Sequence, residues 1–264
     1  MRKFVFLAGL PRTGSTVLGT LLSQHTELKT TATSVVRGLM WHTLNLNLGQ
    51  SLYYNRYDDK SELWGTLRGI LNGAYESYPQ SIIVEKDRGW AKDVSITAKV
   101  IGETPKIIAP VRSLPDIIAS FVLVARKAGI SSKIYEEVIT AGREINSWSL
   151  SRIIWEKYVY HSWRDMKASY EAHPECFHLV EYDGLLGNTG AVMGDIYNFI
   201  GVNPISTETK NLINPHPEND TVYGLKGLHD VRSELKRTSP PAWEILGDSC
   251  YSFWCEKNLE FWRG

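Results

Sequence analysis

Residues 3–25 constrain the fold more than any other part of the chain, because they join an apolar run, a glycine loop and an amphipathic helix. The run KFVFLAGL (3–10) is short and nearly continuous, as is typical of a strand buried on both faces of a parallel sheet. Gly9 and Pro11 end it, and STVLGTLLSQH (15–25) then carries valine and leucine at helical spacing. In this arrangement the loop N–H groups and the positive end of the helix can hold an anion.

The loop in FLAGLPRTGST departs from the common phosphate-binding pattern G-x-x-x-x-G-K-[ST] at one position. Gly9, Gly14 and Thr16 fit the pattern, but Ser15 stands where the lysine belongs. That lysine reaches the β- and γ-phosphates of a nucleoside triphosphate, which a serine cannot neutralise. Arg12 lies inside the loop instead and offers a planar fork of donors that suits a compact anion. The pattern therefore predicts an anion site and argues against triphosphate chemistry.

Strand and helix patterns alternate through the rest of the chain. Further strands are expected at 81–87, 106–112 and 177–186, and helices at 114–129, 143–171, 190–201 and 240–262. Trp148, Trp155 and Trp163 are expected near one face of the helical stretch 143–171. The alternation predicts the α/β class, as a P-loop-type three-layer fold with a central parallel sheet flanked by helices. We expect a single domain over residues 1–264.

The stretch 34–80 differs from its surroundings, since it is polar and rich in tyrosine and tryptophan. We expect it to be mostly helical and inserted after the first strand–helix unit, between the first two strands. Its aromatic side chains are candidates for a wall of the acceptor site, or they pack a helical cap.

Composition restricts the partners and the compartment. The 29 basic and 29 acidic side chains cancel, so no overall field favours nucleic acid or an anionic membrane. Three cysteines without metal-ligand spacing indicate a reducing compartment. We see no signal peptide and no run of about 18 apolar residues, and expect a cytoplasmic protein. The oligomeric state stays open.

The sequence PRTGST resembles the 5′-phosphosulfate loop of sulfotransferases that use 3′-phosphoadenosine 5′-phosphosulfate (PAPS). The motif layout is closest to tyrosylprotein-sulfotransferase-like and bacterial sulfotransferases. PAPS has no γ-phosphate, so the resemblance accounts for the absent lysine and implies no metal. It also implies donor contacts from the whole loop: Pro11, Arg12, Thr13, Gly14, Ser15 and Thr16.

A second motif resembles the family's 3′-phosphate site. In PVRSLPDIIASF, Arg112 ends a strand and Ser120 follows eight positions later on a helix. The resemblance implies that this pair clasps the 3′-phosphate, on the side where open α/β sheets bind ligands. Tyr182 in HLVEYDGL is implied to contact the nucleotide. The segment YGLKGLHDVR resembles the loop that closes over the 3′-phosphate and adenine, and offers Lys226, Gly227 and Arg232.

The resemblance also suggests how catalysis is shared. Sulfuryl transfer is an in-line displacement in which positioning and cations carry most of the effect. Arg12 is expected at the bridging region of the donor. Lys86 in VEKDRGW corresponds to the family lysine that points into the site. The acceptor is a hydroxyl or amine of a small molecule, glycan or peptide.

The resemblance leaves the catalytic base unassigned. Tyrosylprotein sulfotransferases have a glutamate shortly after the first helix, and the matching position here is Thr33, which cannot accept a proton. His229 is the first candidate, followed by Glu85 and His42. A phenolic acceptor would need little help from a base. His25, at the end of the first helix, is expected to be structural.

Two rival functions are kept open. A small-molecule kinase with a degenerate loop would need an acidic residue for magnesium, and Asp87 is available. A nucleotide-binding protein without catalysis would use the same loop. Lys86 separates these classes, because an enzyme needs it and a binder tolerates its loss.

Overall fold

A five-stranded parallel sheet forms the centre of the computed structural model, which describes residues 2–49, 61–225, 227–257 and 259–263. The strand order is β2-β3-β1-β4-β5. The strands are β1 (Lys3–Leu7), β2 (Leu28–Thr33), β3 (Ile82–Lys86), β4 (Lys106–Val111) and β5 (Phe177–Glu181). All four pairings are parallel, which confirms the predicted fold class.

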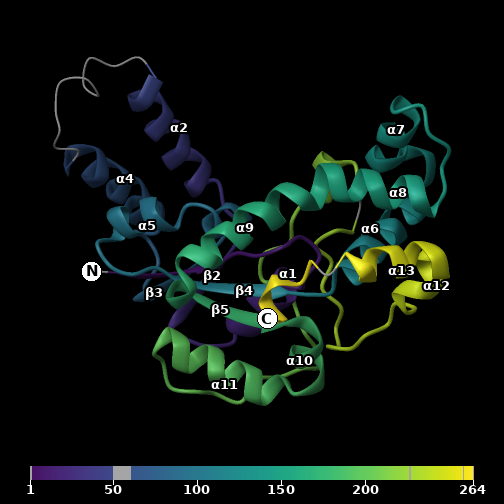
Figure 1. Cartoon of the computed structure of the whole chain (residues 1–264). Coiled ribbons are helices and arrows are strands. Elements are labelled where there is room, and N and C mark those ends of the chain that lie inside the picture. Colours follow the sequence, from purple (N-terminus) through teal and green to yellow (C-terminus); the bar gives the residue numbers. More distant parts are fainter. Residues whose placement is uncertain (1, 50–60, 226, 258, 264) are drawn as a thin grey trace.

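Helices cover both faces of the sheet (Figure 1). One face carries α1 (Ser15–Leu22), α10 (Tyr182–Gly187) and α11 (Thr189–Ile200). The other carries α5 (Val94–Ile101), α6 (Leu114–Ala128), α8 (Ser147–Ile154) and α9 (Tyr160–Ala172). The central strand β1 alternates between the two layers, with Phe4 and Phe6 in one core and Val5 and Leu7 in the other. Burial on both faces explains why this strand reads as a continuous apolar run.

The second strand is a correction to the sequence analysis. β2 follows α1 directly, so the helical insertion lies between β2 and β3 and not between the first two strands. The insertion contains α2 (Val36–Gly49) and α4 (Ser61–Ala74). β2 is an edge strand with the sequence LKTTAT, and only Leu28 and Thr30 within it are buried. An edge strand has one ladder partner and needs little apolar surface, which is why hydrophobicity does not reveal it.

The long helical stretch before β5 is one helix with an irregular turn. A π-helical turn at Trp155–Val159 separates α8 from α9. The rings of Trp155 and Trp163 lie 5.7 Å apart, and Trp155 also contacts Trp254 in α13 (Asp248–Glu256). The expected closing helix is in fact two, because α12 (Ala242–Leu246) ends at Gly247, whose φ of 81° interrupts it.

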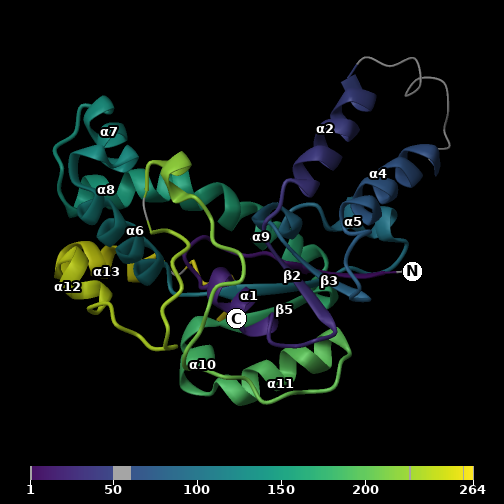
Figure 2. The same ribbon diagram turned by 180° about the vertical axis from the view of Figure 1, so that it is seen from behind.

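The segment between α11 and α12, residues 201–241, has little regular structure. Its described part contains one 3-10 turn, Asp220–Tyr223, and an isolated bridge. Figure 2 shows this segment in light green, running past α1. Its residues Asn214 and Pro215 line a small pocket together with Thr16 and Thr20 of α1. The segment also reaches α7 (Lys133–Thr140), where the Lys133 N–H donates to the Gly224 carbonyl at 3.5 Å, and α7 and α8 project from the body of the protein (Figure 1). No helix within the described residues is long and apolar enough to cross a membrane.

Candidate active site

The carboxyl ends of the strands meet at one edge of the sheet. The ladder places Lys86 level with both Leu7 and Thr33, and Val111 level with Glu181. Above these ends lies an open cavity of about 1130 Å³, roofed by the 201–241 segment. The order of connections reverses at β1, which is where open α/β sheets bind ligands.

The loop between β1 and α1 has the backbone of an anion cradle. Gly14 precedes α1 with φ 91°, and a Cβ there would stand 2.9 Å from the ring of Tyr182. Arg12 itself has φ 62°, a left-handed conformation that is uncommon for a residue with a side chain. The Thr13 hydroxyl donates to the Leu10 carbonyl at 2.7 Å and so holds the turn from inside. This loop leaves the N-terminus of α1 facing the cavity.

Two arginines face each other beside this loop. Arg12 donates to the Ser120 hydroxyl at 3.1 Å and to the Leu228 carbonyl. Burial, together with the charge of Arg112, lowers the pKa of Arg12 to about 10, so it is still protonated at neutral pH. The guanidinium of Arg112 stacks on Tyr182, 4.5 Å from the ring centroid. Burial lowers its pKa as well, although the nearby Asp116 acts in the opposite direction.

Arg112 has one nitrogen without a partner in the described part of the chain. The Nε of Arg112 is buried and has no hydrogen-bond partner among the described residues. Burial disfavours the charged forms of Arg12 and Arg112, and the charge of Arg112 further disfavours that of Arg12, so an anion bound beside them would offset these effects. The sequence analysis placed Ser120 with Arg112 at the 3′-phosphate, and in the structure its hydroxyl accepts from Arg12.

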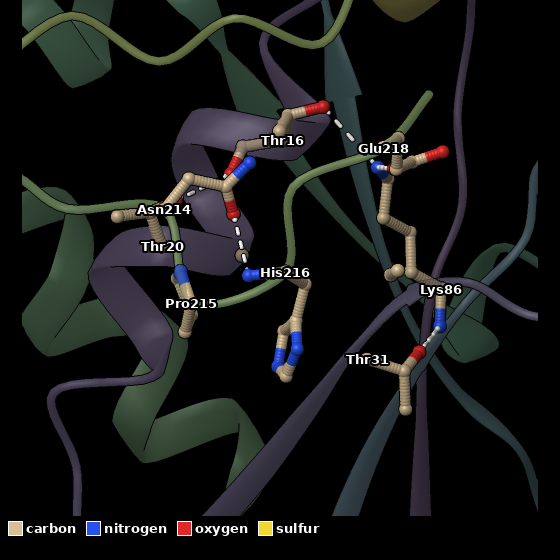
Figure 3. A pocket seen from close by; sticks show the side chains of 10 residues that line it. Thr16, Thr20, Thr31, Lys86, Asn214, Pro215, His216 and Glu218 are labelled. Carbon is tan, nitrogen blue, oxygen red and sulfur yellow. Dashed lines mark hydrogen bonds and ion pairs between the residues drawn. The ribbon is translucent and has the colours of Figure 1, made fainter. Parts of the chain in front are cut away.

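Lys86 lies at the carboxyl end of β3 and points toward α1. Its ammonium donates to the Thr16 hydroxyl at 3.2 Å and to Glu218 Oε1 at 2.8 Å. Figure 3 shows the three side chains meeting beside a small pocket between α1, β2 and the 201–241 segment. Both members of the ion pair are nearly buried, with 8% and 10% of their side-chain surface exposed. Lys86 therefore has one donor left for a group in the cavity.

His229 stands on the other side of Glu218. Its Nδ1 lies 2.5 Å from Asp220 Oδ1 and 3.8 Å from Glu218 Oε2. The backbone N–H of His229 also donates to Asp220, at 2.9 Å. A carboxylate that accepts from Nδ1–H selects the tautomer in which Nε2 carries no proton.

Most residues expected at the donor site lie in one place. Those that line the cavity are Pro11, Arg12, Gly14, Ser15, Thr16, Arg112, Ser120, Tyr182, Gly227 and Arg232. The two other expected catalytic residues, Lys86 and His229, line it also. Thr13 does not, because its side chain is buried within the loop. Lys226 lies outside the described residues.

The other base candidates lie elsewhere. Glu85 faces the opposite side of the sheet from Lys86, where Trp90 and Tyr75 donate to its carboxylate. Burial raises its pKa to about 7 despite these bonds. His42 is exposed on α2 and is not among the residues lining the cavity. His25 is buried and bonded to Asn203 and Glu27 through its two ring nitrogens, as a structural histidine is.

Two further predictions concern Asp87 as a magnesium ligand and an aromatic wall for the acceptor. Asp87 lines the cavity but pairs with Arg37 and caps the turn that follows β3. No cluster of three or more metal-ligating side chains occurs within the described residues. The aromatic side chains described between 34 and 80 do not line this cavity; Tyr75, for example, packs on Phe4. Tyr53, Tyr54 and Tyr57 lie outside the described residues, and the acceptor wall stays a prediction.

Sequence reasoning missed two carboxylates of this site, Glu218 and Asp220. Both lie in a proline- and asparagine-rich segment with no periodicity. Glu218 pairs with Lys86, which lies 132 positions away in the sequence, so no local sequence pattern indicates the pair. The only available signal was an acidic residue on each side of Asn219, close to a histidine expected to be functional.

Comparison with known proteins identifies a family. The model of the sulfotransferase family matches residues 5–206. A search of the curated proteins gave no match.

Among solved structures, a sulfotransferase from Alicyclobacillus acidocaldarius is similar, at 16% identity and a TM-score of 0.49, over 81% of this chain and 87% of that one. The sulfotransferase STF9 from Mycobacterium avium is 14% identical, with a TM-score of 0.48 over 78% and 65% of the two chains. The sulfotransferase domain of the Synechococcus PCC 7002 olefin synthase is 16% identical, with a TM-score of 0.45 over 97% and 94%.

Proposed function

The chain belongs to the sulfotransferase family, and we propose that it transfers the sulfuryl group of PAPS to an acceptor hydroxyl or amine. The observation that carries the choice of donor is the pair of half-buried arginines at the glycine loop. Burial lowers the pKa of both Arg12 and Arg112, although Asp116 lies 3.5 Å from Arg112, and Ser120 stands within hydrogen-bond distance of Arg12. A nucleotide with separate 3′ and 5′ anionic groups fits such a site.

The donor would lie along the carboxyl edge of the sheet. Backbone N–H groups of the loop and the N-terminus of α1 would hold the 5′-phosphosulfate. Arg112 and Ser120 would hold the 3′-phosphate, with Tyr182 beside them. Gly227 and Arg232 line the same cavity from the 201–241 segment and would close over the nucleotide. Lys226 belongs to this proposed set through its sequence alone.

Transfer then requires charge stabilisation and removal of one proton. The acceptor oxygen or nitrogen attacks sulfur, and the bond from sulfur to the 5′-phosphate oxygen breaks, which releases 3′-phosphoadenosine 5′-phosphate (PAP). Lys86 would stabilise the charge on the sulfuryl and bridging oxygens, and Arg12 that on the departing phosphate. The acceptor's proton would go to Nε2 of His229, whose other nitrogen Asp220 holds.

Calorimetric titration with PAP, and separately with ATP and magnesium, tests the donor. We expect PAP to bind without a metal. Arg112→Ala should weaken PAP at least tenfold, since it removes a charge-assisted contact worth about 1.5–3 kcal/mol. Arg126→Ala is the matched control, because Arg126 is exposed on α6 and does not line the cavity. Preference for ATP with magnesium would instead support the kinase, and binding of neither nucleotide would refute the proposal.

A further inference from the structure

The position of Glu218 is the least expected feature of the site. Its carboxylate comes from the irregular 201–241 segment and is held at three points. Oε1 accepts from Lys86 Nζ at 2.8 Å and from the backbone N–H of Thr33 at 3.3 Å. Oε2 lies 3.8 Å from Nδ1 of His229. These contacts join the end of β3, the end of β2 and the segment that roofs the cavity.

The residue next to the Glu218 carboxylate, Thr33, shows why this position matters for function. It occupies the place where the resemblance to tyrosylprotein sulfotransferases calls for a glutamate, and its own side chain cannot act as one. The carboxylate of Glu218 lies directly against the Thr33 backbone. A carboxylate is thus present at this point of the sheet edge, but a different part of the chain supplies it.

The carboxylate is anionic where it stands. Burial acts to raise the pKa of Glu218, but the hydrogen bond from Lys86 and the charge of Lys86 outweigh burial and lower it. A charged carboxylate between an ammonium and an imidazole fixes the orientation of both. It also occupies only one donor of Lys86, and Thr16 takes another, so the third can reach the cavity.

We propose that Glu218 is a positioning residue for sulfuryl transfer, which fixes the ammonium of Lys86 and the imidazole of His229 relative to each other. The inference rests on the function proposed above. The sulfuryl group moves from a donor that Lys86 would contact to an acceptor that His229 would deprotonate. The distance between these two side chains therefore decides how well donor, sulfur and acceptor are aligned. The side chain of Glu218 contacts both Lys86 and His229 and so fixes that distance.

Glu218→Gln tests the assignment, because it keeps the shape and removes the charge. Turnover is measured with labelled PAPS and a panel of phenols, alcohols and amines. We expect kcat to fall at least tenfold, while the affinity for PAP stays within twofold, because Glu218 contacts neither Arg112 nor Ser120. Affinity for PAPS relative to PAP should rise about threefold or more, since a negative charge beside the sulfuryl group is removed. Glu218→Asp should recover part of the turnover.

The control is Glu208→Gln, an exposed glutamate in the same segment, which should behave as wild type. A combination with His229→Gln adds a readout that a merely structural role would not produce. If Glu218 acts through His229, Glu218→Gln should lower kcat much less in the His229→Gln background than in the wild-type background.

Three outcomes would overturn the inference. One is a kcat within threefold of wild type, and another is a parallel loss of PAP and PAPS affinity, which indicates only structural damage. The third applies if no acceptor in the panel turns over. The ratio of PAPS affinity to PAP affinity is then the only test, and a ratio that is the same in Glu218→Gln and wild type contradicts the positioning role. Failure of the wild-type protein to bind PAP refutes the proposed function itself, which keeps the two failures distinguishable.

Discussion

The ring of Tyr182 closes against the backbone of Gly14, so that a single added methyl group at Gly14 would lie 2.9 Å from two ring carbons. Tyr182 is the first residue after β5, and Gly14 is the last before α1. The stack of Arg112 on the same ring extends this contact to the end of β4. One aromatic side chain therefore links the loop to the arginine proposed to bind the 3′-phosphate.

Gly14→Ala should weaken PAP binding by about tenfold or more. The alanine must adopt a left-handed φ of 91° and also displace Tyr182, which disturbs the loop and the Arg112 stack together. Calorimetry measures the affinity. The matched control is Gly190→Ala in α11, where a Cβ meets nothing within 4 Å and where alanine favours the helix. Equal affinities of the two variants would show that the loop geometry is unimportant for the nucleotide.

Lys86→Met should abolish most transfer while leaving PAP bound. Removal of a cation from a site of developing charge costs about 100-fold or more in kcat. PAP lacks the sulfuryl group that Lys86 is proposed to contact, and so its affinity should change little. The measurement is turnover of PAPS beside calorimetry with PAP. A variant that keeps its turnover would support the non-catalytic reading of Lys86, and Lys92→Met, outside the cavity lining, serves as the control.

Asp220→Asn should lower kcat by about 10- to 100-fold without a matching loss of donor affinity. The substitution weakens the hold on the Nδ1–H of His229, and the imidazole then adopts the wrong tautomer or orientation for a base. Steady-state kinetics on the acceptor that gives the highest turnover would detect it. Asp195→Asn, an exposed change on α11, should have no effect. If both aspartate variants retained full kcat, His229 would not be the base.

Glu85 should make the protein less stable as the pH rises from about 4.5 to 7. Burial raises its folded-state pKa to about 7, above the value of 4.5 expected in the unfolded chain. In this window the folded protein holds a proton that the unfolded chain releases, so its stabilising effect is present at low pH and is lost as the pH rises through 7.

Urea unfolding of wild type and Glu85→Gln at pH 5 and pH 8 isolates the effect. Relative to the variant, wild type should lose about 2 kcal/mol between the two values. The variant keeps an acceptor oxygen for Trp90 or Tyr75 but cannot ionise. The same pH dependence in both proteins would mean that Glu85 is ionised throughout.

The sequence predicted the features of this protein that short patterns determine. The β1 loop, the four expected strands and the α/β class follow from apolar runs that contact their neighbours on both faces of the sheet, and such runs are visible locally. The sulfotransferase resemblance rested on PRTGST and on Arg112 with Ser120, and the family match over residues 5–206 confirms it.

The features that were missed depend on contacts distant in the chain. β2 is held through pairing to β3, and its threonines gave no apolar signal. Glu218 acquires its place only when residues 33, 86 and 229 are brought together by the fold. A single glutamate in an aperiodic segment looks the same whether it is solvated or buried against a lysine.

The cavity combines two stretches of chain with different chemistry. Every residue proposed to stabilise the sulfuryl group or the 3′-phosphate by charge, apart from those of the closing loop, precedes residue 206, where the family match ends. Glu218, Asp220 and His229, which are proposed to position Lys86 and to accept the acceptor's proton, all follow it. The 201–241 segment therefore serves both steps, because Glu218 pairs with Lys86 and because Gly227 and Arg232 line the donor cavity, so a segment exchanged from a relative must keep these contacts while it changes acceptor activation.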